Sequence, residues 1–338
     1  MKKLIISLLS LLFISQTVFA GSIEVLPTMQ SKTNVQDRVW VGTFQLVWND
    51  LMDKYVHGIV KFIDGTPEVV NELNQQEITT NDINENCFYK YSGKITKNTK
   101  KIITNAIMKK FNETSDIIDK LDLTPSSNRF IIYAMLKKDF KFTHAFDKLG
   151  KSYFRDTKAD FFGITGRSNE ELKNGVKVLF YNSESDYAVS LQTIGDDEVF
   201  LYKTPNTKTF NYIYSDMIKK QENFNGKKYM AKKDELKIPN LKFFEEKEFS
   251  EFSGKRIKGT QLQIEQALET IKFEMNNEGV KLKSEAAITM RATSVGPNFE
   301  EKPRYFYFDD TFVIFLKEKN KSNPYFALRV HDINNFQK

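Results

Sequence analysis

Short apolar runs, separated by polar turns, recur along the chain from residue 130 onward. Residues 130–135 form a continuous apolar run with two adjacent isoleucines and a tyrosine, which is short enough to be a strand buried on both faces. Similar runs predict further strands at residues 176–181, 187–194, 199–202, 305–308, 312–316 and 325–330. The polar segment 317–324 suits a hairpin loop between the last two strands.

Helical periodicity appears closer to the N-terminus. Apolar side chains recur at helical spacing at Trp40, Phe44, Val47, Trp48 and Leu51. Asp37 is a candidate cap before this helix, and Gly58 is a candidate stop after it. A second helix is predicted where one face carries Ile103, Ala106, Ile107 and Phe111. Residues 65–91, rich in Asn, Gln, Thr and Glu, show the weakest pattern of all.

This mixture of helices and many strands predicts an α+β fold, with mixed sheets and helices packed around them. No fixed-period repeat is visible, which argues against a solenoid or a propeller. With 338 residues, 40% hydrophobic content, 29 Phe and 14 Tyr, the chain has ample material for a large core.

The N-terminus has the three-part layout of a cleavable secretory signal. Lys2 and Lys3 precede an apolar run over residues 4–13, and Val18-Phe19-Ala20 then offers a small-residue cleavage site before Gly21. We therefore expect residues 1–20 to be removed and the protein to be secreted or periplasmic. No later stretch approaches roughly 20 apolar residues, so no membrane span is predicted.

Charge and cysteine content narrow the classes of function. The formal charge is +6, but 50 basic and 44 acidic residues are interspersed, which indicates an ordinary solvated surface rather than a nucleic-acid site. Cys87 is the only cysteine, so no intrachain disulfide is possible and stability must come from burial.

Enzyme signatures are absent from the sequence. It contains no glycine-rich phosphate loop, no Gly-x-Ser-x-Gly elbow and no histidine pair at metal-binding spacing. His57, His144 and His331 are far apart in sequence, and the polar surroundings of Cys87 favour a plain thiol over a nucleophile. We expect a protein that is not an enzyme and needs neither metal nor cofactor.

Several segments, taken in order, share their pattern with one known family of proteins. The run after Asn128, continuing to Ala145-Phe146-Asp147, looks like a serpin strand that ends in an aromatic and Pro-Phe-Asp, with Arg129, Phe146 and Asp147 matching. Further similar segments are residues 176–191, 236–243 with Ile238-Pro239, 262–279, and the C-terminal pair 312–316 and 326–330. Together these segments resemble the serpin family of protease inhibitors and their non-inhibitory relatives. Ala159-Asp160-Phe161-Phe162-Gly163-Ile164 also resembles a serpin motif, but it occurs too early in the chain and is treated as coincidence.

Segment 262–279 is the most informative part of the resemblance, because it ends in Asn276-Asn277-Glu278-Gly279, where serpins carry the acidic-Gly hinge of the reactive loop. Its apolar spacing alone fits either a helix through Ile264 and Ala267 or a strand through Ile271, Phe273 and Met275. The resemblance favours the strand.

The resemblance covers residues 110–335 and implies a single serpin-like domain over residues 21–338, a divergent or shortened bacterial-type member. Residues 31–110 show no family motif, so the N-terminal third is expected to be remodelled. The resemblance also implies a monomer whose partner is a serine or cysteine protease.

Serpin inhibition, which the resemblance implies, inserts a cleaved loop into a sheet as a new strand. The residues that become core must then be small or apolar, because a buried unpaired charge costs several kcal/mol. The implied hinge residues here are Glu278, Gly279, Val280, Leu282 and Ser284, with Lys281, Lys283 and Glu285 pointing outward. The implied bait loop runs over residues 280–303, with the cut near Arg291, Ala292, Thr293 and Ser294.

The chain departs from the family pattern at two positions where serpins form hydrogen bonds across the opening sheet. Ala134 stands in place of an Asn, and Glu269 stands in place of a His. Two functions follow as hypotheses: a suicide protease inhibitor, or a secreted non-inhibitory module that keeps the fold and binds a ligand or partner through the loop or the aromatic strand faces.

Overall fold

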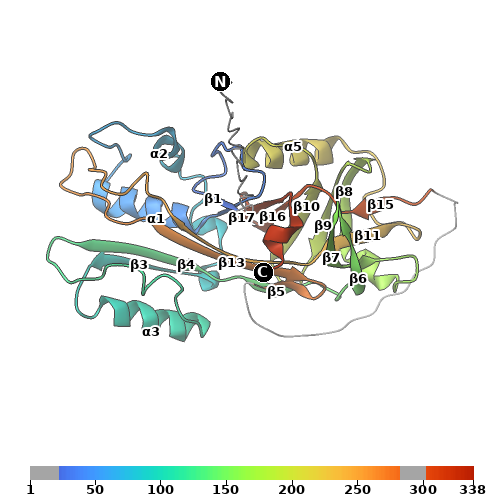
Figure 1. The fold of residues 1–338 in the computed structure, drawn as a ribbon, viewed down its shortest axis with the longest axis horizontal. Helices are drawn as coiled ribbons and strands as arrows, with labels where there is room; N and C mark the ends of the chain where they lie inside the picture. Colours follow the sequence, from blue (N-terminus) through green and yellow to red (C-terminus); the bar gives the residue numbers. More distant parts are fainter. Residues whose placement is uncertain (1–22, 282–301) are drawn as a thin grey trace, which may run out of the picture.

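The computed structural model of the protein describes residues 23–281 and 302–338, and it has the α+β fold with mixed sheets predicted from the sequence. The largest sheet has seven strands in the order β1-β2-β17-β16-β10-β9-β8 (Figure 1). Their bounds are β1 Glu24–Leu26, β2 Arg38–Val41, β8 Val176–Ser183, β9 Asp186–Gln192, β10 Asp197–Lys203, β16 Phe312–Glu318 and β17 Phe326–Val330.

The other strands form three smaller sheets. One has the order β15-β11-β7-β6, from Tyr305–Tyr307, Glu235–Pro239, Thr157–Ile164 and Asp147–Phe154. Another has the order β12-β13-β14-β5, from Leu241–Glu248, Leu268–Asn276, Gly279–Lys281 and Asp139–Lys141. The last pairs β3, Phe88–Lys94, with β4, Phe130–Leu136.

All the strands predicted from apolar runs are confirmed, and β16 and β17 form the predicted antiparallel hairpin. Segment 262–279 contains a strand, β13, so the helical alternative is wrong. Segment 159–164 forms most of β7, with Phe161, Phe162 and Ile164 buried.

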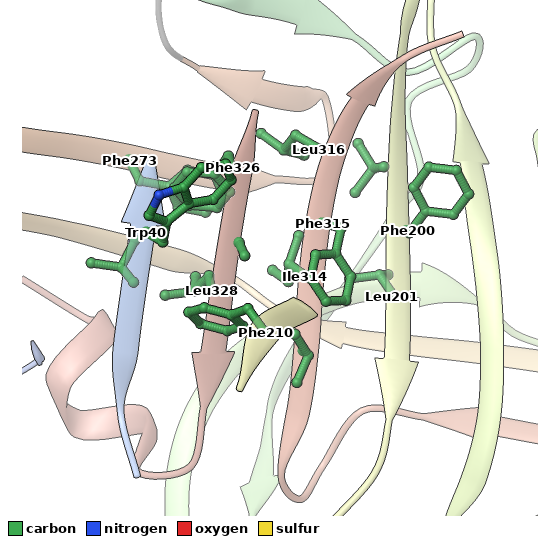
Figure 2. Packing of buried hydrophobic residues seen from close by; sticks show 14 of the residues in the cluster. Trp40, Phe200, Leu201, Phe210, Phe273, Ile314, Phe315, Leu316, Phe326 and Leu328 are labelled. Carbon is green, nitrogen blue, oxygen red and sulfur yellow. The ribbon is translucent and has the colours of Figure 1, made fainter. Parts of the chain in front are cut away.

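Aromatic side chains fill the interface between the large sheet and its neighbours (Figure 2). Phe273 of β13 stacks on Phe326 of β17, with ring centroids 4.8 Å apart. Phe210, at the start of helix α5 (Phe210–Asn223), packs edge-on against Phe315 of β16. Such ring pairs add to the large apolar area that each aromatic side chain buries, so they hold the layers together.

The first predicted helix is present but begins later than expected. Helix α1 covers Thr43–Leu51 and continues as a π-helical turn, Met52–Val56, that ends at His57, just before Gly58. Trp40 lies on strand β2 rather than on the helix. Asp37 is no helix cap, because its carboxylate accepts hydrogen bonds from the backbone N–H groups of His331 and Asp332 instead.

The second predicted helix is confirmed as α3, Thr99–Phe111, with Ile103, Ile107 and Phe111 buried. The 65–91 segment contains a short helix, α2, Glu68–Leu73, and two 3₁₀ turns, Thr80–Asp82 and Glu85–Cys87, which its weak pattern did not predict. Short α4, Glu171–Asn174, α5 and a C-terminal 3₁₀ turn, Ile333–Phe336, complete the described helices.

Strands β3 and β4 lie between two helices, with α1 packed on one face and α3 on the other (Figure 1). On the α3 side, Ile131 and Tyr133 join Ile103 and Ile107 in a small separate core. On the α1 side, Ala134 belongs to the main core. This arrangement leaves the second edge of β4 directed toward β13.

No helix within residues 23–281 and 302–338 is long and apolar enough to cross a membrane. The same ranges contain no group of three His, Cys, Asp or Glu side chains placed to hold a metal ion. The secretory signal predicted at residues 1–20 lies outside the described residues.

Candidate functional site: a cleft between two strands

The chain reverses direction at the acidic-Gly turn and returns as strand β14 between β13 and β5. β14 is antiparallel to both neighbours, so that Val280 is opposite Met275 on one side and Phe140 on the other. The turn itself is bound to the neighbouring segment, since the carbonyls of Glu278 and Asn277 accept hydrogen bonds from the backbone N–H groups of Phe142 and Phe146 at 3.0 and 2.9 Å.

Gly279 is where β14 comes closest to β5. A Cβ atom at this position would lie 2.3 Å from the carbonyl oxygen of Phe140 and 2.8 Å from the Cα of Lys141. Real Cβ atoms do not approach backbone atoms so closely, and backbone cannot move aside as the end of a side chain can. Only glycine therefore permits this pairing.

Val280 is fully buried, like Met275 opposite it. Directly paired residues of antiparallel strands point to the same face of a sheet, so the core face continues from Met275 onto the returning strand. Of the hinge residues predicted from the sequence, Glu278, Gly279 and Val280 lie at this turn and strand. Leu282 and Ser284, together with the predicted cleavage region Arg291 to Ser294, lie outside the described residues.

A cleft of about 1160 Å³ continues from the end of β14 between β4 and β13. Among the described residues, β4 pairs with β3 alone, and β13 pairs with β12 and, at its C-terminal end, with β14. No strand within residues 23–281 and 302–338 therefore lies between the facing edges of β4 and of the first part of β13. Open strand edges present N–H and C=O groups that can pair with a further strand.

Helix α1 forms the inner wall of this cleft. Phe44, Val47 and Trp48 line it from below the sheet, within an aromatic cluster in which Phe44 and Phe249 have ring centroids 4.4 Å apart. Ile117, Leu121 and Leu123 line it from the opposite side. These apolar side chains are typical of a binding cavity, although charged residues such as Asp122, Arg129 and Lys272 also line the cleft.

The linker between α3 and β4, residues 112–129, crosses to the β13 side of the cleft. The Asp122 N–H donates to Gln266 Oε1 at 2.9 Å, and Lys120 forms an ion pair with Glu246 of β12. At the end of the linker, Arg129 ion-pairs with both Glu265, at 2.7 Å, and Asp122, at 2.9 Å. These polar contacts hold the two sides of the cleft together at the end where β4 and β13 begin.

Glu269 lines the cleft from β13, and its side chain points inward with Ile271 and Phe273. It is 4% exposed, and its Oε1 accepts a hydrogen bond from the Phe44 N–H, at the start of α1, at 3.2 Å. Burial raises the pKa of this carboxyl to about 8, against a small lowering by the Phe44 N–H. Among the described residues, Oε2 has no hydrogen-bond partner.

Ala134 lines the cleft from β4, the other wall. The two residues that depart from the family pattern thus lie on opposite walls of one cavity. The hydrogen bond found for Glu269 runs to the helix beneath the sheet, and Ala134 has no polar side-chain atom with which to bond across it.

A buried ion cluster anchors the β4–β5 wall to the large sheet. Lys138, between these strands, is 3% exposed and binds Glu318 at 2.5 Å and Asp197 at 2.8 Å. Its ammonium also lies over the ring of Tyr325, 4.8 Å from the centroid. The adjacent Cys87 thiol is half-buried, and burial raises its pKa, as expected for a thiol that is not a nucleophile.

Sequence reasoning missed Lys138 and the linker contacts. Nothing in the local pattern distinguishes Lys138 from the adjacent Lys137, because the difference arises from which acidic residues the fold brings near each. The sequence does contain a signal for the inward direction of Glu269, because this residue follows the same two-residue alternation as Ile271 and Phe273.

Comparisons by sequence find no matching protein-family model and no matching curated protein. Among solved structures, the chain is similar to Serpin48, a serpin of the insect Tenebrio molitor, with 14% identity, 78% of each chain covered and a TM-score of 0.45. It is also similar to human thyroxine-binding globulin complexed with thyroxine, with 9% identity and a TM-score of 0.44.

A further structure of thyroxine-binding globulin with thyroxine shows 11% identity and a TM-score of 0.43. In both globulin comparisons the match covers 69% of this chain and 64% of the other. The similar structures thus include a serpin, the family that the sequence resembles.

Proposed function

We propose that the protein is a secreted, monomeric, serpin-like inhibitor of a serine or cysteine protease, which acts by inserting its cleaved loop into the cleft between β4 and β13. One observation carries the proposal: the chain after the acidic-Gly turn already forms a strand, β14, between β13 and β5, and the cleft continues from the end of that strand. Extending that strand is the simplest way to pair the open edges of β4 and β13.

The pairing of β14 defines the register of the inserted strand. Continued without a shift, it sets Leu282 opposite Phe273, Ser284 opposite Ile271, and Ala286 between Glu269 and Ala134. Lys283 and Glu285 then point to the outer face. The inward positions carry only uncharged side chains, which is the condition for burial at low cost.

The chemistry of inhibition in this proposal belongs to the protease. Its nucleophile attacks a peptide bond near Arg291 to Ser294 and forms an acyl-enzyme, and the freed upstream segment enters the cleft before water completes the hydrolysis. Insertion moves the attached protease away from its starting position. The inhibitor supplies strand-pairing energy and no catalytic group.

Incubation with a trypsin-like and a chymotrypsin-like protease tests the proposal. We expect a covalent complex that survives denaturant in gel electrophoresis. The matched variants Ser284→Lys and Glu285→Lys each introduce one lysine into the same segment, but only the first faces the core in the inferred register. Ser284→Lys should convert the protein into a substrate, and Glu285→Lys should not. Clean loop cleavage of the unaltered protein, with protease activity undiminished, would falsify the proposal.

The alternative is a non-inhibitory secreted protein that keeps this fold and binds a ligand or partner. The observation in its favour is the preformed cleft with a buried, half-satisfied carboxyl, Glu269, at a position where the family pattern has a different residue. If cleavage leaves the protease free and the melting temperature unchanged, this alternative is favoured.

A further inference from the structure

The cleft between β4 and β13 contains a recognition feature that strand insertion does not use. In the inferred register, Ala286 would face Glu269 and leave its Oε2 atom without a hydrogen bond. A buried polar atom without a partner is unfavourable, because nothing compensates the loss of its hydrogen bonds to water. A molecule that enters the cleft and forms a hydrogen bond with this oxygen should therefore bind more tightly than one that does not.

The surroundings of Glu269 indicate which chemistry would satisfy it. The cross-strand neighbour on β12 is Lys247, but within residues 23–281 and 302–338 no ion pair joins it to Glu269, and the Oε2 atom has no hydrogen-bond partner. Several other charged residues in or near the cleft do have ionic partners: Asp122 and Glu265 pair with Arg129, Lys137 with Glu113, and Lys138 with Asp197 and Glu318.

The rest of the cavity is suited to an apolar body. Phe44, Val47 and Trp48 on one side, with Ile117 and Leu121 on the other, border a volume that is large enough for a drug-sized molecule. Other acidic residues also line the cleft, but Glu269 is buried and has an unpartnered oxygen, so together with the apolar side chains it is complementary to an apolar molecule with a single cationic nitrogen. The ammonium would pair with Glu269 and the apolar part would contact the aromatic wall.

We propose that this cleft binds a small apolar amine, whose ammonium donates a hydrogen bond to the unpartnered oxygen of Glu269. The inference does not depend on protease inhibition, because the cavity exists before any loop cleavage. It does have a consequence for inhibition: an amine and an inserted strand cannot occupy the same space, so a bound amine holds the cleft against insertion.

Binding of the amine should release a proton to solvent. The Glu269 carboxyl is mostly protonated at pH 7, since its pKa is about 8, whereas an alkylamine, like lysine, is charged. Forming the pair takes one proton from the carboxyl and releases it to solvent, leaving a carboxylate beside an ammonium. The release is close to one proton per amine bound, and an interaction at an exposed, ionised carboxylate would release none.

Calorimetric titration of the mature protein with 4-phenylbutylamine, and with the neutral isostere 4-phenylbutan-1-ol, provides the test. We expect saturable binding of the amine, at least tenfold tighter than the alcohol. In buffers of different ionisation enthalpy at pH 7, the heats should show release of nearly one proton. Glu269→Gln should abolish both the amine preference and the proton release. Glu274→Gln removes a carboxyl from the outer face of the same strand and should preserve both.

Equal binding of amine and alcohol, no binding of either, or an unchanged amine preference in Glu269→Gln would each overturn the proposal. The proton count needs no variant, so the test survives if Glu269→Gln fails to fold. Failure here leaves the protease experiment untouched, and failure of inhibition leaves amine binding to intact protein measurable. The two proposals are thus judged separately.

Discussion

The carboxyl group of Glu269 accepts a hydrogen bond from the backbone N–H of Phe44 at 3.2 Å, and this contact joins the wall of the cleft to helix α1. Glu269 lies at the N-terminal end of β13, in the part that pairs with no described strand on the cleft side, and Phe44 lies in the first turn of α1. A strand entering the cleft passes directly over this contact. The stability of the cleft is therefore linked to one buried carboxyl.

The first prediction concerns the dependence of stability on pH. The folded-state pKa of Glu269 is about 8, above the usual 4.5, so between these values the folded protein holds a proton that the unfolded chain has lost. The stability associated with this group is fully present below about pH 4.5 and is lost as pH rises through about 8, with a ceiling on the order of 5 kcal/mol.

Denaturant unfolding from pH 5 to 9 measures this effect. The unaltered protein should lose stability relative to Glu269→Gln across the interval, and the difference should level off above pH 9. Glu274→Gln serves as the control and should follow the unaltered protein. Parallel curves for all three proteins would show that Glu269 does not titrate as inferred.

The second prediction concerns Gly279. Gly279→Ala places a Cβ atom against the Phe140 carbonyl, so β14 must separate from β5. We expect faster hydrogen exchange at the amides of Phe140 and Val280, together with a measurable loss of stability. Gly58→Ala is the matched control, because a Cβ at that position meets no atom within 4 Å. Unchanged exchange at Val280 in Gly279→Ala would refute the close approach.

The third prediction concerns Lys138. Lys138→Met leaves Glu318 and Asp197 buried without their cation, and breaking a buried pair in this way costs about 3 to 5 kcal/mol. Lys137→Met removes the more accessible pair with Glu113 and should cost about 1 kcal/mol. Chemical denaturation compares the two variants. Similar losses would mean that the cluster does not anchor the wall of the cleft.

The fourth prediction concerns the linker, residues 112–129, at the end of the cleft where β4 and β13 begin. Arg129→Gln removes its ion pairs with Glu265 and Asp122, both of them well exposed, so global stability should change by about 1 kcal/mol or less. Hydrogen exchange in residues 112–129 should nevertheless increase. Lys32→Gln, which removes an exposed pair with Glu68 far from the cleft, is the control. No increase in linker exchange would rule out a fastening role for Arg129.

Local patterns were sufficient for the strands formed by continuous apolar runs, such as β8, β10 and β16, but not for short strands such as β1, β5 and β14. Segment 312–330 is a hairpin whose apolar runs and polar turn lie within one stretch of sequence, so its prediction needed no tertiary information. Asp37 has the appearance of a helix cap, yet its partners are the amides of His331 and Asp332, nearly the whole chain away. Helix α5 was missed although Thr209 caps it and Phe210, Ile213 and Met217 share its buried face.

The candidate site also combines a feature that the local pattern predicts with one that depends on the tertiary fold. Alternation along residues 269–275 gives the inward face of β13, and therefore the burial of Glu269, from sequence alone. The cleft does not follow from any such pattern, because it is a property of two strands, β4 and β13, that are more than a hundred residues apart and do not pair. Neither strand indicates by itself that its partner edge is open.

Thermal unfolding before and after selective cleavage between Arg291 and Ser294 tests strand insertion most directly. Filling the cleft with a paired strand adds backbone hydrogen bonds and apolar burial, so the cleaved protein should melt at a clearly higher temperature than the intact one. The amides of β4 and β13 that face the cleft should become protected from exchange at the same time. A cleaved protein that melts at the same or a lower temperature, with those amides still exchanging freely, would contradict insertion into this cleft.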